Sequence, residues 1–547
     1  MEPRNLHRVA RSLGLLGDDL IPYGHDVAKV QLSARARPRA GERPPRLVLV
    51  SAITPTPAGE GKTTTAIGLG DALAIRGERV CLALREPSMG PCFGLKGGGT
   101  GGGRSQLTPA ERINLHFTGD IHAVGAAHNL LAAVIDNHMH HGNALRLDPR
   151  RIHWRRVMDM NDRALRNVVT GLGGHRHGVP REGGFDITAA SEVMAMLCLA
   201  EDAEDLRARL DRTLVGFTYD GEPITAGRLG ATGSMLVLLR DALLPNLVQT
   251  LEGTPALVHG GPFANIAHGC NSVIATRTAL HLADWCVTEA GFGFDLGAEK
   301  FYDIACRQSG LTTAAVVLVA SVRALKLHGG HPRQELERPD AAAVTRGLPN
   351  LAKHVQNIRC FSQRAVVALN RFASDTPEEI AAVRAWCEAE GVPFAESDHH
   401  ARGGEGALAL ADAVLAHADE VARPFTPLYA NDQPVPDKIA SVARAMYGAR
   451  DVVFTREAQR DLAAIETHGY AGLPVCIAKT HSSLSDDPSR RGRPQDFEVS
   501  VESLVVNAGA GFIVVLTGDI VRMPGMPRRP RAERVDLVDG EVVGLLD

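Results

Sequence analysis

The chain has 547 residues, of which 44% are hydrophobic, 22% are charged and 4% are aromatic. This length is too great for a single hydrophobic core, so several domains are expected. A formal net charge of −4 and a pI near 6.6 argue against general binding to nucleic acid or to an anionic membrane surface.

The nine cysteines are dispersed along the chain and include no Cys-x-x-Cys pair. This pattern does not indicate a disulfide framework or a zinc site, and it fits a reducing compartment. Residues 1–11 are charged and lack the apolar segment of a signal peptide, and the most apolar stretch, 314–322, is too short to span a bilayer. We therefore expect a cytoplasmic protein with neither a nucleic acid nor a membrane as its partner.

Short apolar runs alternate with helical patterns along the chain, and a Gly-rich or polar segment follows most of them. The runs are 47–51, 80–84, 256–259, 285–288, 315–320 and 366–370. Continuous apolar strands that alternate with helices are typical of a parallel sheet with helices on both faces. The predicted fold class is α/β, in which ligands bind beyond the carboxyl ends of the strands.

The first run leads into a Gly-rich turn, Thr56-Pro57-Ala58-Gly59-Glu60-Gly61-Lys62-Thr63. A strand, a turn of this kind and a helix N-terminus place several backbone N–H groups against an anion. In such a cradle Lys62 reaches the outer phosphates of a nucleotide, and Thr63 ligates Mg²⁺. The general P-loop pattern has Gly at the position of Thr56, so the motif predicts a narrower class than NTPases at large.

Arg85 and Glu86 follow the second run, and beyond them Lys96 precedes a segment, 97–103, in which six of seven residues are glycine. An arginine at the end of a strand can grip a carboxylate or phosphate with two hydrogen bonds, although a structural ion pair is an equal alternative. Glu86 could order Mg²⁺, act as a base or hold Arg85. The glycines, Gly97 and Gly98 among them, permit close approach to a ligand, which favours a lid or an anion-lining loop.

Two later segments also follow predicted strands. The segment 259–272 offers His268, Asn265 and Asn271, which could bind substrate or satisfy the backbone of a tight turn. Phe372 follows the run 366–370, and ring stacking on a ligand and core packing are equally open for it.

These segments, in this order, resemble the formate–tetrahydrofolate ligase family over nearly the whole chain. The resemblance rests on 56–63, 85–88, 94–103, 159–163, 250–255, 259–272, 319–330, 509–513 and 516–520. It implies that formate attacks the γ-phosphate of MgATP, and that the resulting formyl phosphate passes its formyl group to N10 of tetrahydrofolate. It also implies a homotetramer and activation by a monovalent cation such as K⁺ or NH₄⁺.

The resemblance also implies roles for individual residues. Lys62 would stabilise the transferring phosphoryl group, Thr63 would help to hold Mg²⁺, and Arg85 would bind formate and then formyl phosphate. In the family an aromatic pair clamps a planar ring; Phe372 matches one member, and His400 stands in place of the family's tryptophan. Arg104 replaces the tyrosine that usually follows the three glycines, so the folate side is where this chain departs most.

We expect a P-loop-containing parallel sheet covered by helices, with two smaller α/β domains. The nucleotide-binding domain would comprise 1–115 and 250–345, with 116–249 inserted and 346–547 contributing the folate-side pocket. A P-loop switch or transport NTPase is one alternative, which Thr56 and the unmet Asn-Lys-x-Asp pattern after 366–369 oppose. A weakened folate- or nucleotide-binding paralogue is the other, suggested by His400 and Arg104.

Overall fold

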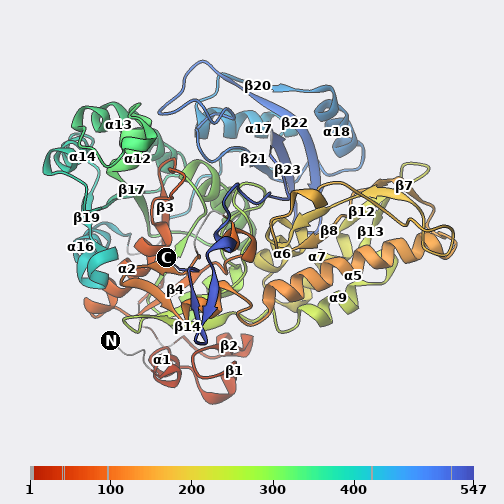
Figure 1. Cartoon of the computed structure of the whole chain (residues 1–547), viewed down its shortest axis with the longest axis horizontal. Helices are drawn as coiled ribbons and strands as arrows, with labels where there is room; N and C mark the ends of the chain where they lie inside the picture. The colour runs from red at the N-terminus through yellow and green to blue at the C-terminus, as the bar shows by residue number, and fades with distance from the viewer. Residues whose placement is uncertain are drawn as a thin grey trace.

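The computed structural model describes residues 5–39, 41, 43–94, 98–419, 423–518 and 520–546. Its main feature is a 12-stranded central sheet, shown in Figure 1. The order of its main path is β1 (Leu20–Pro22), β2 (Ala28–Val30), β14 (Asn246–Thr250), β15 (Pro255–Val258), β4 (Val80–Leu84), β16 (Trp285–Glu289), β3 (Arg46–Ala52), β17 (Ala315–Ala320), β18 (Ala365–Asn370) and β19 (Phe394–Ser397). Off this path, β6 (Ser105–Thr108) pairs with β14, and β5 (Gly101–Gly102) pairs with β6.

Every strand predicted from an apolar run is confirmed, as β3, β4, β15, β16, β17 and β18. From β15 to β19 all neighbouring strands are parallel, whereas β1, β2 and β14 pair antiparallel at one side. The carboxyl ends of the parallel strands therefore lie along one edge of the sheet, where the predicted site residues follow them.

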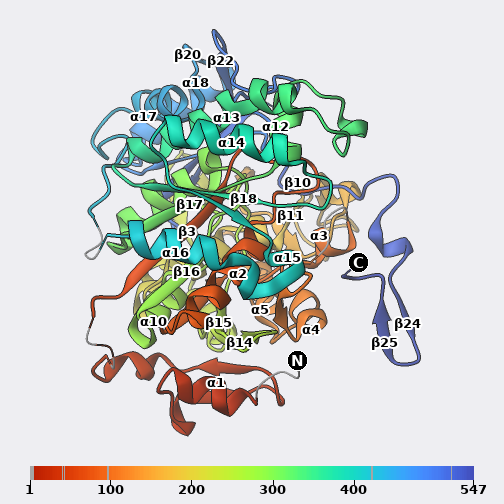
Figure 2. The same cartoon turned by 90° about the vertical axis from the view of Figure 1, so that its left-hand side faces the viewer.

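The sheet is buried on both faces because alternate residues of each strand enter two different cores. Leu47 and Leu49 of β3 belong to one core, and Val48 and Val50 belong to the other. This explains why the strands read as continuous apolar runs. The helices that complete these cores include α10 (Val273–Leu282) and α13 (Ala341–Cys360) on the first face, and α2 (Lys62–Ile75) and α16 (Leu408–His417) on the second, which faces the viewer in Figure 2.

Two further units flank the sheet in Figure 1. The first carries α5 (Asp120–His140), α6 (Glu192–Leu199), α7 (Ala203–Arg212) and a small sheet of β7 (Leu147–Ile152), β12 (Leu214–Thr218) and β13 (Pro223–Thr225). The second carries α17 (Val435–Val442), α18 (Arg456–Thr467) and a sheet of β20 (Asp451–Phe454), β22 (Glu498–Asn507), β23 (Phe512–Thr517) and β21 (Val475–Ala478). Pairing in the central sheet crosses two boundaries proposed from the sequence, since β14 begins before residue 250 and β18 and β19 lie beyond residue 346.

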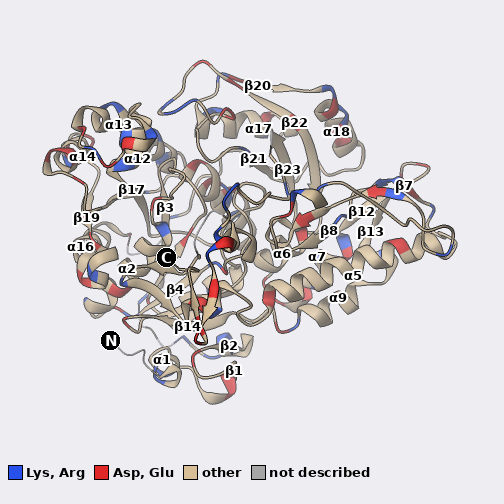
Figure 3. Ribbon diagram, in the orientation of Figure 1, with Lys and Arg blue, Asp and Glu red and all other residues tan. Residues whose placement is uncertain are grey.

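Basic and acidic residues are interspersed over all three parts of the chain in Figure 3, in line with the small net charge. Within the described ranges, no helix combines the length and the apolar character that a membrane span requires.

Candidate active site at the carboxyl edge of the sheet

The Gly-rich turn between β3 and α2 has the backbone geometry that its sequence predicts. Gly59 (φ 81°) and Gly61 (φ 75°) adopt the left-handed conformation, and α2 begins at Lys62 immediately afterwards. Thr56 does not adopt that conformation, so a β-branched residue fits there without strain. Its backbone N–H donates to Oε1 of Glu60 at 2.6 Å. The departure from the general P-loop pattern therefore introduces no backbone strain at residue 56.

The turn is held from outside by α12 (Val322–His328) and by the end of β18. Ser321 Oγ donates a hydrogen bond to Oε2 of Glu60, and Arg323 Nη2 donates to the carbonyl of Gly59 at 2.5 Å. Asn370 Nδ2 donates to the carbonyl of Glu60 at 3.0 Å. Ser321 and Arg323, which both belong to the family-like segment 319–330, thus stabilise the turn through hydrogen bonds.

Two buried histidines hold the start of the turn. The backbone N–H of Thr54 donates to Nε2 of His354 at 2.9 Å, and His328 Nε2 donates to the carbonyl of Thr54 at 2.8 Å. Burial lowers the pKa of each imidazole to about 4, so both rings are neutral near pH 7. Nε2 of His354 can accept the hydrogen bond only because that ring is neutral.

Glu289, at the carboxyl end of β16, joins the turn to Arg85. Thr63 Oγ1 donates to Oε2 of Glu289 at 2.8 Å, while Nη2 of Arg85 lies 3.7 Å from Oε1. The carboxylate is 4% exposed and the guanidinium 24% exposed, so water screens this pair only in part. The order of the strands explains the contact, since β16 lies between β3 and β4.

Glu86 lies in a different environment from Glu289. Its carboxyl is buried, and its Oε2 has no hydrogen-bond partner among the described residues. Burial raises the pKa of Glu86 well above its usual range, and the negative charge of nearby Asp120 raises it further. The carboxylate beside Arg85 is thus Glu289, and Glu86 makes no ion pair with Arg85 in the part of the chain that the structure describes.

The loop 259–272 lies beside Arg85, as its position after β15 predicts. A Cβ placed on Gly291 would lie 2.9 Å from Nη1 of Arg85 and 2.5 Å from Cβ of Ala264, so the loop and the guanidinium enclose that glycine. Neither ring nitrogen of buried His268 has a hydrogen-bond partner within the described ranges, and the same is true of Oδ1 of Asn265. Burial, with the cations around it, lowers the pKa of His268 to about 3. Buried polar atoms without partners indicate where a ligand's polar atoms would bind.

Phe372 and His400 follow β18 and β19, which are neighbours in register at Asn370 and Ser397. Phe372 is half-buried, and the Arg323 guanidinium lies 4.0 Å from its ring centroid. His400 is exposed, and its carbonyl accepts from the backbone N–H of Arg104 at 2.9 Å. Both rings therefore lie at the same edge of the sheet. Arg104, which stands where the family usually has a tyrosine, contacts the backbone of His400.

Lys96 and Gly97 lie outside the described residues, so only the later part of the glycine-rich loop is assigned a position. A Cβ on Gly98 would lie 2.2 Å from Oδ1 of Asn114, and the N–H of Gly99 donates to that same oxygen at 2.8 Å. Further along, a Cβ on Gly103 would lie 2.2 Å from the carbonyl of His400. At these positions glycine is needed because the backbone packs closely against its neighbours.

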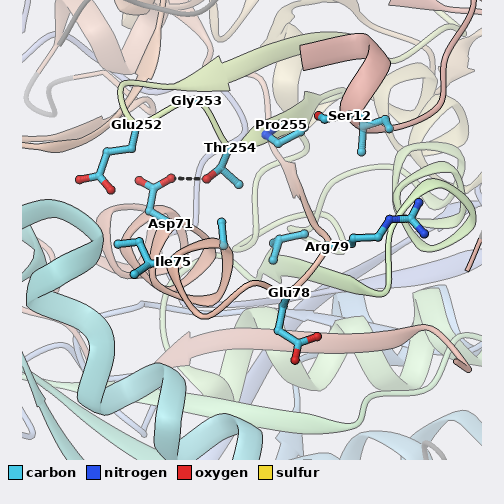
Figure 4. A pocket seen from close by; sticks show the side chains of 12 residues that line it. Ser12, Asp71, Ile75, Glu78, Arg79, Glu252, Gly253, Thr254 and Pro255 are labelled. Carbon is cyan, nitrogen blue, oxygen red and sulfur yellow. Dashed lines mark hydrogen bonds between the residues drawn. The ribbon is translucent and has the colours of Figure 1, made fainter. Parts of the chain in front are cut away.

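The sequence did not reveal Glu289, Ser321 or Arg323 as site residues. Glu289 carried one usable signal, an acidic residue at the end of an apolar strand. Ser321 and Arg323 lay inside a family-like segment whose task was unknown until the fold brought it to the turn. A cavity of about 340 Å³, drawn in Figure 4, lies at the opposite end of α2 and includes Asp71, Glu252 and Thr254, so it is separate from this site.

A parallel sheet, a Gly-rich turn at its carboxyl edge and a helix that begins with Lys62 are the arrangement of α/β enzymes that handle phosphate groups. The family model described as formate–tetrahydrofolate ligase matches residues 1–546. Proteins of that name from Paracoccus denitrificans and Hyphomonas neptunium are 57% and 55% identical to this chain, covering 98% and 99% of it and 97% of their own lengths. A third, from Maricaulis maris, is 54% identical over 98% of this chain and 97% of its own length. The chain belongs to the formate–tetrahydrofolate ligase family, and it is a ligase that joins formate to tetrahydrofolate at the expense of ATP.

Proposed function

We propose that this chain makes 10-formyltetrahydrofolate, ADP and phosphate by way of formyl phosphate, with the residues above in defined roles. The observation that carries the proposal is the chain of contacts from Thr63 through Glu289 to Arg85. It joins a phosphate-binding helix N-terminus to a cation suited to formate, across one buried carboxylate. The two reactants of the first step would therefore meet at one end of β16.

On the nucleotide side, the turn 56–61 and the N-terminus of α2 would receive the phosphates of ATP. Backbone N–H groups and Lys62 would stabilise the negative charge that moves during phosphoryl transfer. The hydroxyl of Thr63 and the carboxylate of Glu289 are hard oxygen donors of the kind that Mg²⁺ prefers, and they already lie 2.8 Å apart. Held by these two groups, Mg²⁺ bound with ATP would supply positive charge next to the phosphates.

On the formate side, Arg85 would hold the carboxylate in line with the γ-phosphorus. One formate oxygen attacks phosphorus, and the bond to the ADP oxygen breaks. The mixed anhydride that results hydrolyses readily in water, so a part-buried site that limits water is needed. Burial raises the pKa of Glu86 and so favours its protonated form, and we propose that it donates a hydrogen bond to the intermediate rather than removing a proton.

On the folate side, Phe372 and His400 would lie against the pterin ring, with Lys96, Gly97 and Gly98 closing over the intermediate. N10 of tetrahydrofolate attacks the formyl carbon, phosphate leaves with the C–O bond electrons, and N10 loses its proton. The position of Phe372 and His400 at one edge supports this assignment. Homotetrameric assembly and activation by K⁺ or NH₄⁺ are further proposals that rest on the family resemblance.

A coupled assay that omits formate, ATP or tetrahydrofolate in turn tests the reaction. We expect product only when all three substrates are present, whereas hydrolysis of ATP without formate and tetrahydrofolate as the main activity would favour a switch or transport NTPase. Absence of product under all conditions would favour a weakened paralogue.

Lys62→Ala and Arg85→Ala test the two charge assignments. Each should lower kcat at least about a hundredfold, because each removes a cation that stabilises the transition state. Retained activity in either variant would remove that residue from the mechanism.

A further inference from the structure

A second cavity, of about 490 Å³, lies where the three parts of the chain meet and shares no residue with the site above. Its wall comes from the end of α7, from β13, from α11 (Arg307–Ser309), and from the C-terminal unit around β21 and β23. The volume lies within the range of small-molecule sites, about 300–1,000 Å³. The lining residues are Arg212, Thr225, Arg307, Gln308, Asn431, Tyr470, Gly472, Leu473, Pro474, Ala508 and Gly511.

The charge of this cavity has one sign. Arg212 and Arg307 line it, and no carboxylate does. Arg307 is offset by an ion pair with Asp303 at 2.8 Å, whereas Arg212 makes no ion pair within 4 Å in the described ranges and the carboxylates of Asp205 and Glu192 act on it from further away. Nε and Nη2 of Arg212 donate to the carbonyls of Ala508 and Gly509 at 3.0 and 2.9 Å, which leaves its Nη1 group available. A guanidinium NH₂ group that is free to donate suits a carboxylate or a phosphate.

A second arginine, Arg209, lies near Arg212, and Asp205 pairs with Arg209 at 3.0 Å. Burial and nearby Arg209 lower the pKa of Arg212 from its usual range, and the carboxylates of Asp205 and Glu192 oppose part of that shift. The Arg209 guanidinium itself donates to Oε1 of Gln308 and to the carbonyl of Ala510, both at 3.2 Å. A bound anion would relieve this repulsion.

The remaining wall is apolar and includes one aromatic ring. Leu473, Pro474 and Ala508 line it, together with half-buried Tyr470. The Tyr470 hydroxyl has no hydrogen bond in the described part of the chain, so it is available as a donor or acceptor. An inorganic ion would leave this apolar surface in contact with water, whereas a molecule with a ring or short apolar body would cover it.

We propose that this cavity binds a small organic anion, a ring-bearing molecule with a carboxylate or a phosphate, at a place distinct from the substrate site. The charged group would bind Arg212, and the ring would lie against Tyr470 and Leu473. The proposal does not depend on the mechanism proposed above, because no residue of the substrate site lines the cavity.

The fold links this cavity to the active edge of the sheet. Gln308 and Arg307 end a helical run that includes two π-helical segments, η5 (Phe294–Ala298) and η6 (Phe301–Cys306). That run starts soon after Glu289. A ligand at Arg307 and Gln308 would therefore stabilise the C-terminal end of the helical run that follows Glu289, the proposed Mg²⁺ ligand. It would also contact all three parts of the chain.

Isothermal titration of the full chain with three probes tests the proposal. p-Aminobenzoylglutamate carries carboxylates, adenosine monophosphate carries a phosphate, and inorganic phosphate lacks a ring. We expect at least one ring-bearing probe to bind more tightly than inorganic phosphate, and its affinity to fall at least about tenfold in Arg212→Gln, as loss of a charge-assisted hydrogen bond predicts. Binding of p-aminobenzoylglutamate would indicate a carboxylate ligand, and binding of adenosine monophosphate would indicate a phosphate ligand.

Control variants separate this cavity from the substrate site. Arg240→Gln removes the same charge from an exposed arginine that pairs with Asp241, and it should leave the affinity unchanged. Gly472→Asp adds a carboxylate at the wall where a Cβ meets no atom within 4 Å, so this variant should fold normally and still abolish binding. If Arg212→Gln fails to fold, Gly472→Asp decides the question.

Three results would overturn the proposal. One is that no probe binds at millimolar concentration. Another is that inorganic phosphate binds as tightly as either ring-bearing probe. The third is that Lys62→Ala (for adenosine monophosphate) or Phe372→Ala (for p-aminobenzoylglutamate), rather than Arg212→Gln or Gly472→Asp, removes the binding, which would assign the probe to the substrate site.

Discussion

Replacing Glu289 with glutamine separates two effects of one carboxylate. The substitution keeps the shape of a side chain that is 4% exposed, and its amide oxygen can still accept from Thr63. It removes the charge that would help to hold Mg²⁺ and that also attracts Arg85. We therefore expect kcat and the KM for formate both to fall, for different reasons.

The two magnitudes follow from the geometry. Loss of a charged group that stabilises the transition state lowers kcat about 10²- to 10³-fold, or about 3–4 kcal/mol. At 3.7 Å the attraction between Arg85 and Glu289 is about 4 kcal/mol for an effective dielectric constant of about 20, and partial exposure of Arg85 reduces it. If about a third of this attraction is released to formate, KM for formate falls roughly tenfold.

Steady-state kinetics with formate and Mg²⁺ varied separately measure both effects. Glu498→Gln is the matched control, since it removes an equal charge from a partly exposed ion pair with Arg450 in the C-terminal sheet, and both constants should stay unchanged. An unaltered kcat in Glu289→Gln would refute the role in holding Mg²⁺. A higher KM for formate would refute the view that Glu289 competes for Arg85.

Further predictions concern the turn, the histidines and the folate side. Gly61→Ala should raise the KM for ATP at least about fivefold more than Gly59→Ala does. Both glycines have positive φ, but only a Cβ added at residue 61 would clash with another residue, since it would lie 2.5 Å from Nδ2 of Asn370. Equal effects of the two substitutions would contradict this interpretation of the turn. The free energy of unfolding should fall as the pH drops from about 6.5 to about 4, because the pKa of His354 and of His328 is about 4 when folded and 6.5 otherwise, so the unfolded chain takes up protons first. Each residue contributes up to about 3 kcal/mol, and the fall in Tm should be shallower in His354→Gln; an equally steep fall in that variant would exclude His354 as a source. His400→Trp should lower the KM for tetrahydrofolate about threefold to tenfold, as a larger stacking surface predicts, and an unchanged KM would remove His400 from the ring clamp.

Much of the fold was readable in the sequence because its information is local. A strand buried on both faces must be apolar at every position, so each run of β-branched residues predicted its strand. The turn 56–63 was equally readable, since positive φ at Gly59 and Gly61 and a helix start at Lys62 are properties of a few adjacent residues. The order of motifs along the chain also sufficed to indicate the family.

The partners of these local features were decided only by the tertiary structure. The order of strands in the sheet brings Glu289 between Thr63 and Arg85, and no spacing along the chain encodes that order. Burial, which depends on all surrounding elements, keeps His354 neutral and raises the pKa of Glu86. The sequence by itself determined which segments form strands and the Gly-rich turn, whereas contacts between residues far apart in the chain determined which side chains meet there and how burial shifts their pKa values.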